Sequence, residues 1–144
     1  MRRLDLFKTV MITAFILACT DEPNQTNFMV SVKNISSSTM RIEAFEKKNI
    51  VFQEDLSTGE NSPSCNYTDE NFRGIFQNYC GIDSMVVKFN NQQGYISINN
   101  NLGDFNFSNK RNPLLPNGGF EIKGNIYEFL VTEEDFKNAF ELPE

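Results

Sequence analysis

The chain contains no histidine and no tryptophan, and it has only three cysteines among its 144 residues. The lack of histidine removes most zinc sites, the Ser-His and Cys-His nucleophile pairs and the commonest general base. Basic residues are also scarce: 13 Lys and Arg stand against 19 Asp and Glu, a net charge of −6. Phosphate binding needs clustered basic side chains, so nucleic acid is not an expected partner. We expect no cofactor, no metal and no catalytic residue.

Long apolar runs are also missing. A membrane-spanning helix needs about 20 apolar residues, and no segment of the chain provides them, so no such helix is expected. The most apolar segment is N-terminal, where an uncharged run from Thr9 to Ala18 follows Arg2, Arg3 and Lys8. A basic start, a short apolar run and a small residue at the end are typical of a secretory signal peptide. The predicted organisation is a signal peptide over 1–18, a flexible tether over 19–27 and a single β-rich domain over 28–144.

The end of this leader, Ile16-Leu17-Ala18-Cys19, resembles the lipobox of bacterial lipoproteins, in which a small residue precedes the lipid-accepting cysteine. The resemblance implies that diacylglycerol is attached to the Cys19 thiol, that the leader is cleaved and that the new amino terminus is acylated. Two or three acyl chains, at about 0.8 kcal/mol per buried CH₂, anchor a protein durably. In such lipoproteins an Asp after the cysteine favours the inner membrane, and its replacement by Thr20 favours the outer membrane. The alternative is an ordinary secretory signal with an unmodified cysteine.

An odd number of cysteines is unusual for a secreted protein. If Cys19 carries lipid, Cys65 and Cys80 remain and are able to pair in an oxidising envelope. Closing a loop of about 15 residues stabilises by roughly 3 kcal/mol in the chain-entropy model. The alternative is two free thiols, as a cytosolic location would require.

Apolar and polar residues alternate along most of the predicted domain, which is the period-2 pattern of half-buried strands. Short turn sequences, such as Gly124-Asn125, separate several of these segments and favour antiparallel pairing. The polar stretch 54–63 is expected to be a loop, and 109–119 is expected to be irregular. The predicted fold is mainly β, an antiparallel β-sandwich or small barrel. The predicted strands are 28–33, 40–45, 50–52, 84–89, 95–98, 120–123 and 126–131.

The C-terminal segment shows a helical pattern instead. Thr132-Glu133-Glu134-Asp135 matches a capping box, and acidic residues at a helix start complement the helix dipole. Phe136, Ala139 and Phe140 fall on one face at helical spacing, so we expect a short C-terminal helix that packs on the sheet and ends at Pro143. The three acids are interpreted as capping residues rather than as a metal or acid–base cluster, because consecutive helical side chains diverge.

The segment Asp83-Ser84-Met85-Val86-Val87-Lys88-Phe89, followed by Tyr127-Glu128-Phe129 and by Thr132–Phe136, resembles small β-rich outer-membrane lipoproteins of Bacteroidota. The resemblance implies a lipid-anchored β domain in the bacterial envelope. It brings no catalytic residue to this chain. Asp83-Ser84-Met85 also resembles the O-glycosylation acceptor of that group, which makes Ser84 a candidate modification site, although strand pairing is expected to hide it.

Four aromatic residues lie in or near the segment bounded by the cysteines: Tyr67, Phe72, Phe76 and Tyr79. Aromatic rings beside Asn and Asp side chains are typical of sugar- or peptide-binding surfaces, so these residues are a candidate contact surface. The alternative, which we favour, is a satellite core beneath the loop.

Taken together, the sequence predicts a monomeric, lipid-anchored, non-enzymatic binding or interaction module with an unidentified protein or glycan partner. The alternative is a structural or assembly accessory of an outer-membrane complex that contacts its partner through a sheet edge. A less favoured hypothesis is a carboxylate-only hydrolase, which needs two acids about 5–9 Å apart in a cleft.

Overall fold

The computed structural model describes residues 24–74, 77–99, 103–108 and 111–143. Cys19 and the predicted signal peptide lie outside these residues, as does Phe76. The elements are β1 (Thr26–Asn34), β2 (Met40–Glu46), β3 (Asn49–Leu56), β4 (Cys65–Asp69), α2 (Gln77–Cys80), β5 (Ser84–Phe89), β6 (Gln93–Ile98), β7 (Phe120–Lys123), β8 (Ile126–Val131), α3 (Glu133–Lys137) and β9 (Phe140–Glu141).

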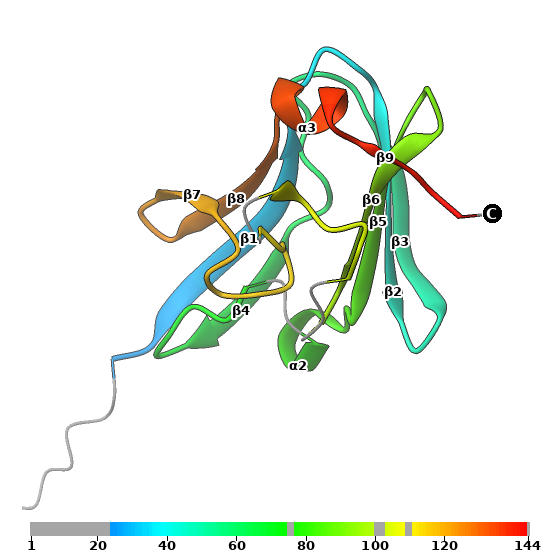
Figure 1. Cartoon of the computed structure of the whole chain (residues 1–144). Coiled ribbons are helices and arrows are strands. Elements are labelled where there is room, and N and C mark those ends of the chain that lie inside the picture. Colours follow the sequence, from blue (N-terminus) through cyan, green and yellow to red (C-terminus); the bar gives the residue numbers. More distant parts are fainter. Residues whose placement is uncertain (1–23, 75–76, 100–102, 109–110, 144) are drawn as a thin grey trace, which may run out of the picture.

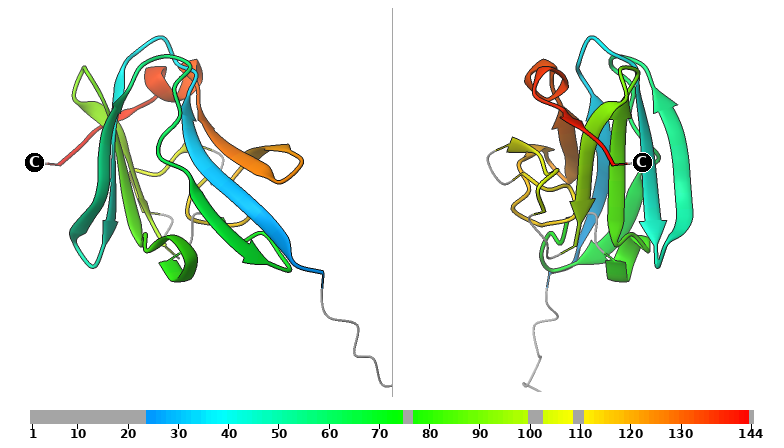
Figure 2. Two further views of the ribbon diagram at one scale, coloured as in Figure 1. Left: turned by 180° about the vertical axis from the view of Figure 1, so that it is seen from behind. Right: turned by 45° about the vertical axis from the view of Figure 1, so that its right-hand side comes forward.

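These strands form two sheets, a four-stranded sheet in the order β4-β1-β8-β7 and a five-stranded sheet in the order β3-β2-β5-β6-β9. The sheets face one another as a sandwich, so the predicted mainly β fold is confirmed and the sandwich, rather than the barrel, is the form it takes. The sheets approach closely near α3 and diverge toward α2, which gives the sandwich a wedge shape (Figure 1, Figure 2).

The core lies between the sheets and follows from the alternation in the sequence. In β1, Val30 and Val32 are fully buried, and in the opposite sheet Ile42 and Val87 face them from β2 and β5. Alternate residues of a strand point to opposite faces, so each of these strands presents one apolar row to the core. Two residues outside the strands are also buried: Leu114, in the predicted irregular segment 109–119, and Phe107, just before that segment.

One strand pairing differs from expectation. Hairpin neighbours such as β2–β3, β5–β6 and β7–β8 are antiparallel, but β1 and β8 pair in parallel, with Val30 opposite Tyr127 and Val32 opposite Phe129. A short turn forces an antiparallel hairpin, whereas strands that are distant in the sequence carry no such constraint. Local turn signals therefore did not reveal this pair.

Three boundary predictions were wrong. β3 runs on to Leu56, so it takes in the first residues of the predicted 54–63 loop, because Glu54 and Asp55 pair with β2 despite their charge. The C-terminal helix does not continue to Pro143 but ends at Lys137. Phe140 then lies in β9, which pairs with β6, and its side chain is exposed rather than packed on a helix face. Sheet pairing in both cases outweighs the local pattern.

Other features of the sequence pattern are confirmed or shifted slightly. The α3 capping box has both of its hydrogen bonds between Thr132 and Asp135. Strand β1 begins at Thr26, inside the range predicted as tether, and β4 occupies a segment in which we predicted no strand. Neither helix in the described part of the chain has the length and apolar character that crossing a membrane requires.

Candidate functional site

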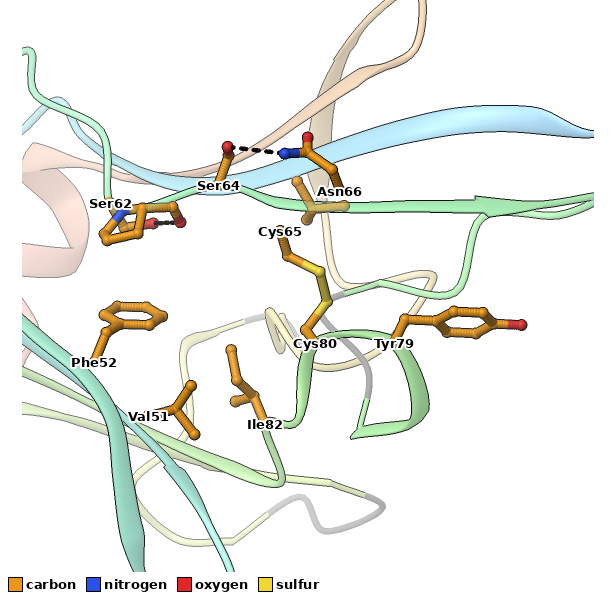
Figure 3. A pocket seen from close by; sticks show the side chains of 11 residues that line it. Val51, Phe52, Ser62, Ser64, Cys65, Asn66, Tyr79, Cys80 and Ile82 are labelled. Atoms are coloured by element: carbon orange, nitrogen blue, oxygen red, sulfur yellow. Dashed lines mark hydrogen bonds between the residues drawn. A yellow bond between two sulfur atoms is a disulfide. The ribbon is translucent and has the colours of Figure 1, made fainter.

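A pocket lies at one side of the sandwich, between the edge strand β3 of one sheet and the edge strand β4 of the other (Figure 3). We call this side the open edge. The pocket has a volume of about 250 Å³. One wall is apolar and comes from Val51, Phe52 and Ile82. The other wall is formed by the segment that leads into β4, by the start of β4 and by α2: Ser62, Pro63, Ser64, Cys65, Asn66, Tyr79 and Cys80. Val30 of β1 also lines the pocket.

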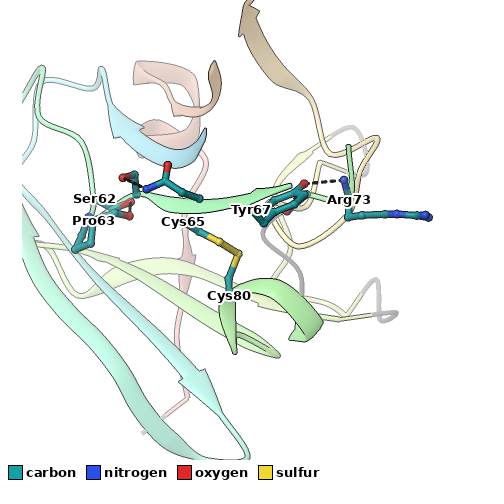
Figure 4. The surroundings of a disulfide bond; sticks show 9 residues. Ser62, Pro63, Cys65, Tyr67, Arg73 and Cys80 are labelled. Atoms are coloured by element: carbon teal, nitrogen blue, oxygen red, sulfur yellow. Dashed lines mark hydrogen bonds between the residues drawn. A yellow bond between two sulfur atoms is a disulfide. The ribbon is translucent and has the colours of Figure 1, made fainter. Parts of the chain in front are cut away.

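A disulfide between Cys65 and Cys80 forms part of this wall (Figure 4). Its Cα atoms are 5.7 Å apart, within the range that a disulfide requires. Cys65 begins β4 in one sheet, and Cys80 closes α2 just before β5 of the other sheet. The bond thus joins the two sheets where they diverge. The free-thiol alternative does not match the described geometry.

The loop between the cysteines is organised around Tyr67. The Tyr67 hydroxyl accepts a hydrogen bond from the Arg73 backbone N–H at 2.8 Å and lies 3.3 Å from the Gly74 carbonyl oxygen, to which it donates. Gly74 has a φ of +77°, and a Cβ there would lie 2.9 Å from the Leu115 carbonyl carbon, so only glycine fits. Burial raises the pKa of the Tyr67 hydroxyl, which keeps it protonated and able to donate.

Tyr79 stands at the end of the pocket and packs on the Tyr67 ring, with centroids 4.6 Å apart and the rings nearly parallel. Its hydroxyl donates to the Asp69 carboxylate. This hydrogen bond is the main cause that lowers the pKa of Asp69 to about 2, and the Asn71 backbone N–H adds to the effect. The same contact raises the pKa of Tyr79.

The structure divides the four aromatic residues of the predicted contact surface. Tyr67 is buried, and Phe72 is half-buried, with its ring stacked 3.7 Å from Tyr127 and edge-on to Phe120. These two residues form the satellite core of the alternative interpretation, because ring–ring packing stabilises them more than exposure would. Phe76 lies outside the described residues. Tyr79 is the member of the set that the described structure exposes, with 42% of its surface accessible.

Two other predicted positions have structural roles. Ser84 begins β5, is half-buried, pairs on both sides with β2 and β6, and donates its hydroxyl to Asp83 at 2.9 Å. In α3, Asp135 is buried and caps the helix through Thr132 instead of joining Glu133 and Glu134 in a cluster. Across the described residues, no group of three potential metal-binding side chains comes together.

Sequence reasoning missed the pocket itself. Val51 and Phe52 were assigned to a short strand and Ile82 to no element, so no pattern brought them to the cysteine-bounded segment. The predicted pairing of Cys65 with Cys80 was a partial signal, because a disulfide fixes the separation of the two residues that it joins, here in β4 and α2.

Sequence reasoning also missed a buried ion pair between Arg111 and Asp135. Arg111 donates to both carboxylate oxygens of Asp135, at 2.9 and 3.0 Å, and its guanidinium lies over the Phe129 ring. Arg111 belongs to the segment that was predicted only as irregular.

No family model matches the chain, and comparison with curated proteins and with solved structures gives no match.

Proposed function

We propose that this protein is a lipid-anchored lipoprotein of the bacterial outer membrane and that its β-sandwich is a non-enzymatic binding module. The sequence supports the anchor through the basic start, the apolar run and the small residue before Cys19. Strand β1 begins at Thr26, so at most about 25 Å of extended chain separates the lipidated residue from the sandwich. The domain then works close to the membrane surface.

The pocket at the open edge is the observation that supports a binding role. It lies between two strands whose outer edges pair with no strand of the described chain, and its lining includes the exposed Tyr79. The residues that line it are apolar, amide or hydroxyl in character, together with the disulfide. Apolar concave surfaces with a few polar groups are the usual form of a binding site. A carboxylate-only hydrolase would need two acids facing a cleft, and this lining supplies none.

A second candidate function is that of a structural accessory in an outer-membrane complex. The long edge strand β3 favours it, because Ile50 and Val51 at its start are 57% and 45% exposed. An exposed edge of this kind is able to pair with a strand of a neighbouring protein.

The lipid anchor is tested by growing cells with an alkyne-bearing fatty acid and comparing the wild type with Cys19→Ser. We expect label on the wild type and on the double variant Cys65→Ala/Cys80→Ala, and no label on Cys19→Ser. Label that persists on Cys19→Ser would contradict the anchor at this residue.

The binding role is tested in intact envelopes by photo-crosslinking. A photoreactive amino acid at Val51, on the pocket wall, should give a discrete adduct. The matched control is Lys88, which is exposed on β5 of the same sheet, separated from β3 by β2 and away from this pocket. Equal adducts at both positions, or none at Val51, would argue against binding through the pocket.

A further inference from the structure

The open edge offers unused backbone hydrogen-bonding groups. Among the described residues, strand β3 pairs only with β2, and from Phe52 to Leu56 this pairing is regular, beyond the bulge near Val51. In an edge strand, alternate residues direct their N–H and C=O groups away from the sheet. At its end the Leu56 carbonyl oxygen accepts from the Asn34 side-chain amide at 2.9 Å, so residues 52–55 are the part of the run that is left to pair with an extended segment of another chain.

The pocket beside this run fits a single bulky apolar side chain. Its volume of about 250 Å³ falls below the range of about 300–1,000 Å³ that is usual for small-molecule sites. One wall is apolar, with Val51, Phe52 and Ile82, and the opposite wall combines the disulfide with the polar side chains of Ser62, Ser64 and Asn66 (Figure 3). A leucine or phenylalanine side chain from an added strand would bury apolar surface against these residues.

A charged group stands next to the pocket on the same strand. Glu54 pairs in register with the fully buried Ile42, and Phe52 pairs with the fully buried Ala44. Glu54 and Phe52 therefore share the inward face of β3, about 7 Å apart along the strand. Glu54 is nevertheless exposed, and within the described residues it forms no ion pair.

These features together select the partner. We propose that the open edge binds an extended, basic peptide segment of a partner protein, which adds as a strand to β3 with one bulky apolar side chain in the pocket and a Lys or Arg two residues away at Glu54. The proposal rests on the proposed binding function and names its partner class. Strand addition is a common mode of peptide recognition, in which the backbone gives affinity and alternate side chains give specificity.

A second copy of this chain fits the same edge poorly. Pairing two β3 edges would bring two unpaired Glu54 carboxylates to one interface, and like charges that oppose one another across strands destabilise the pairing. The whole chain carries a net charge of −6, which also opposes self-association and attracts a basic partner.

The test measures binding of a short fluorescent peptide, rich in Ser and Thr, with one Leu and one Lys two residues further on. The full lipidated protein in detergent micelles is titrated by fluorescence anisotropy. Replacing the peptide Leu by Ala should weaken binding at least about tenfold. Replacing the peptide Lys by Glu should also weaken it, and the variant Glu54→Lys should reverse that preference.

Two control variants and two modified peptides sharpen the result. Glu54→Gln should weaken the Lys peptide about threefold, whereas Glu43→Gln, on the outward face of β2, should leave it unchanged. Peptides N-methylated on alternate amides distinguish strand addition from a looser contact. Only methylation of the amides that face β3 should abolish binding.

The proposal is overturned if the Lys and Glu peptides bind alike, if the Leu-to-Ala peptide binds equally well, or if both N-methylated peptides bind. A dimer that protects the β3 amides from hydrogen exchange without peptide would assign the edge to a second copy and also overturn it.

If a crosslink at Val51 persists while the peptides fail, the partner class is wrong and the binding module stands. If the peptides bind while Cys19→Ser keeps its lipid label, the anchor is wrong and this site stands.

Discussion

Two regions of the wedge-shaped sandwich, the end near α3 and the open edge, are held together in different ways. Near α3 the sheets approach closely, and side chains fill the space between them: Arg111 spans Asp135 and the Phe129 ring, and the Tyr95 hydroxyl donates to the Asp135 carbonyl oxygen at 2.7 Å. We call this the narrow end. At the open edge the sheets diverge, and the disulfide between Cys65 and Cys80 joins them while a pocket remains. Close packing leaves no room for a ligand, whereas a covalent link holds two sheets without filling the gap.

The charged groups of the two regions also differ, because in the described part of the chain one is buried with partners and the other is exposed without them. At the narrow end Asp135 is 2% exposed, and its carboxylate is satisfied by Arg111 and Thr132. Burial, with the Asp135 charge adding to it, raises the pKa of Tyr95 to about 12. At the open edge Glu54 is exposed and has no such partners among the described residues. A satisfied buried network specifies structure, and an exposed unpaired charge beside a pocket is available to a partner.

The largest expected effect is at the narrow end. Asp135→Ala removes the partner of Arg111 and the Thr132 capping interaction together, leaving a partly buried guanidinium unpaired. We expect the free energy of unfolding to fall by about 3–5 kcal/mol, measured by urea denaturation. Glu134→Ala, exposed in the same helical turn, should cost less than about 1 kcal/mol. Similar losses for the two variants would contradict a structural role specific to the buried pair.

A smaller loss is expected when the disulfide is removed. Cys65→Ala/Cys80→Ala opens a link with a sequence separation of 15, which is worth about 3 kcal/mol in the chain-entropy model. Hydrogen exchange should quicken in β4 and α2 more than in α3, because the bond acts at the open edge. The matched control, Cys19→Ser, should leave unfolding unchanged. Alkylation of Cys65 or Cys80 in the native protein without a reductant would show that the pair is not oxidised.

The smallest effect concerns the exposed contact between Tyr79 and Asp69. The Asp69 pKa of about 2 lies below its ordinary value, so the stability this carboxylate contributes is complete above about pH 4 and is lost as the pH falls toward 2. Tyr79→Phe removes the hydrogen bond that is the main cause of the lowered Asp69 pKa, so this pKa should rise. NMR titration of the Asp69 carboxyl carbon measures the change. The Asp83 pKa, which the Lys47 backbone N–H lowers, should not move. An unchanged Asp69 pKa would mean that Tyr79 does not hold this carboxylate.

Much of the fold was predictable because strand alternation and capping are local signals. The alternation placed seven of the strands, and the spacing of Thr132 and Asp135 placed the start of α3. β4 was missed because the segment between the cysteines shows no clear period, and β9 was missed because Phe140 fits a helical pattern equally well. In both cases pairing with a strand distant in the sequence decided the outcome.

The candidate site was less predictable than the fold. The aromatic residues were predicted as one group, with a satellite core favoured over a contact surface, whereas the structure divides them: Tyr67 and Phe72 pack inside and Tyr79 is exposed. A count of aromatic residues does not say which of them the core can bury. Glu54 was assigned to a loop, and only its register opposite Ile42 places it beside the pocket.

The sequence by itself determined which kinds of site the composition excludes, the alternation of the strands and the capped start of the helix. It also left Cys65 and Cys80 as the two cysteines able to pair. These are properties of neighbouring residues, and the chain states them locally. Only the tertiary structure decided that β1 and β8 pair in parallel, that Arg111 meets Asp135, and that the sheets diverge enough to leave a pocket beside the disulfide. Such features depend on how two sheets pack against each other, and that geometry comes from contacts between residues far apart along the chain.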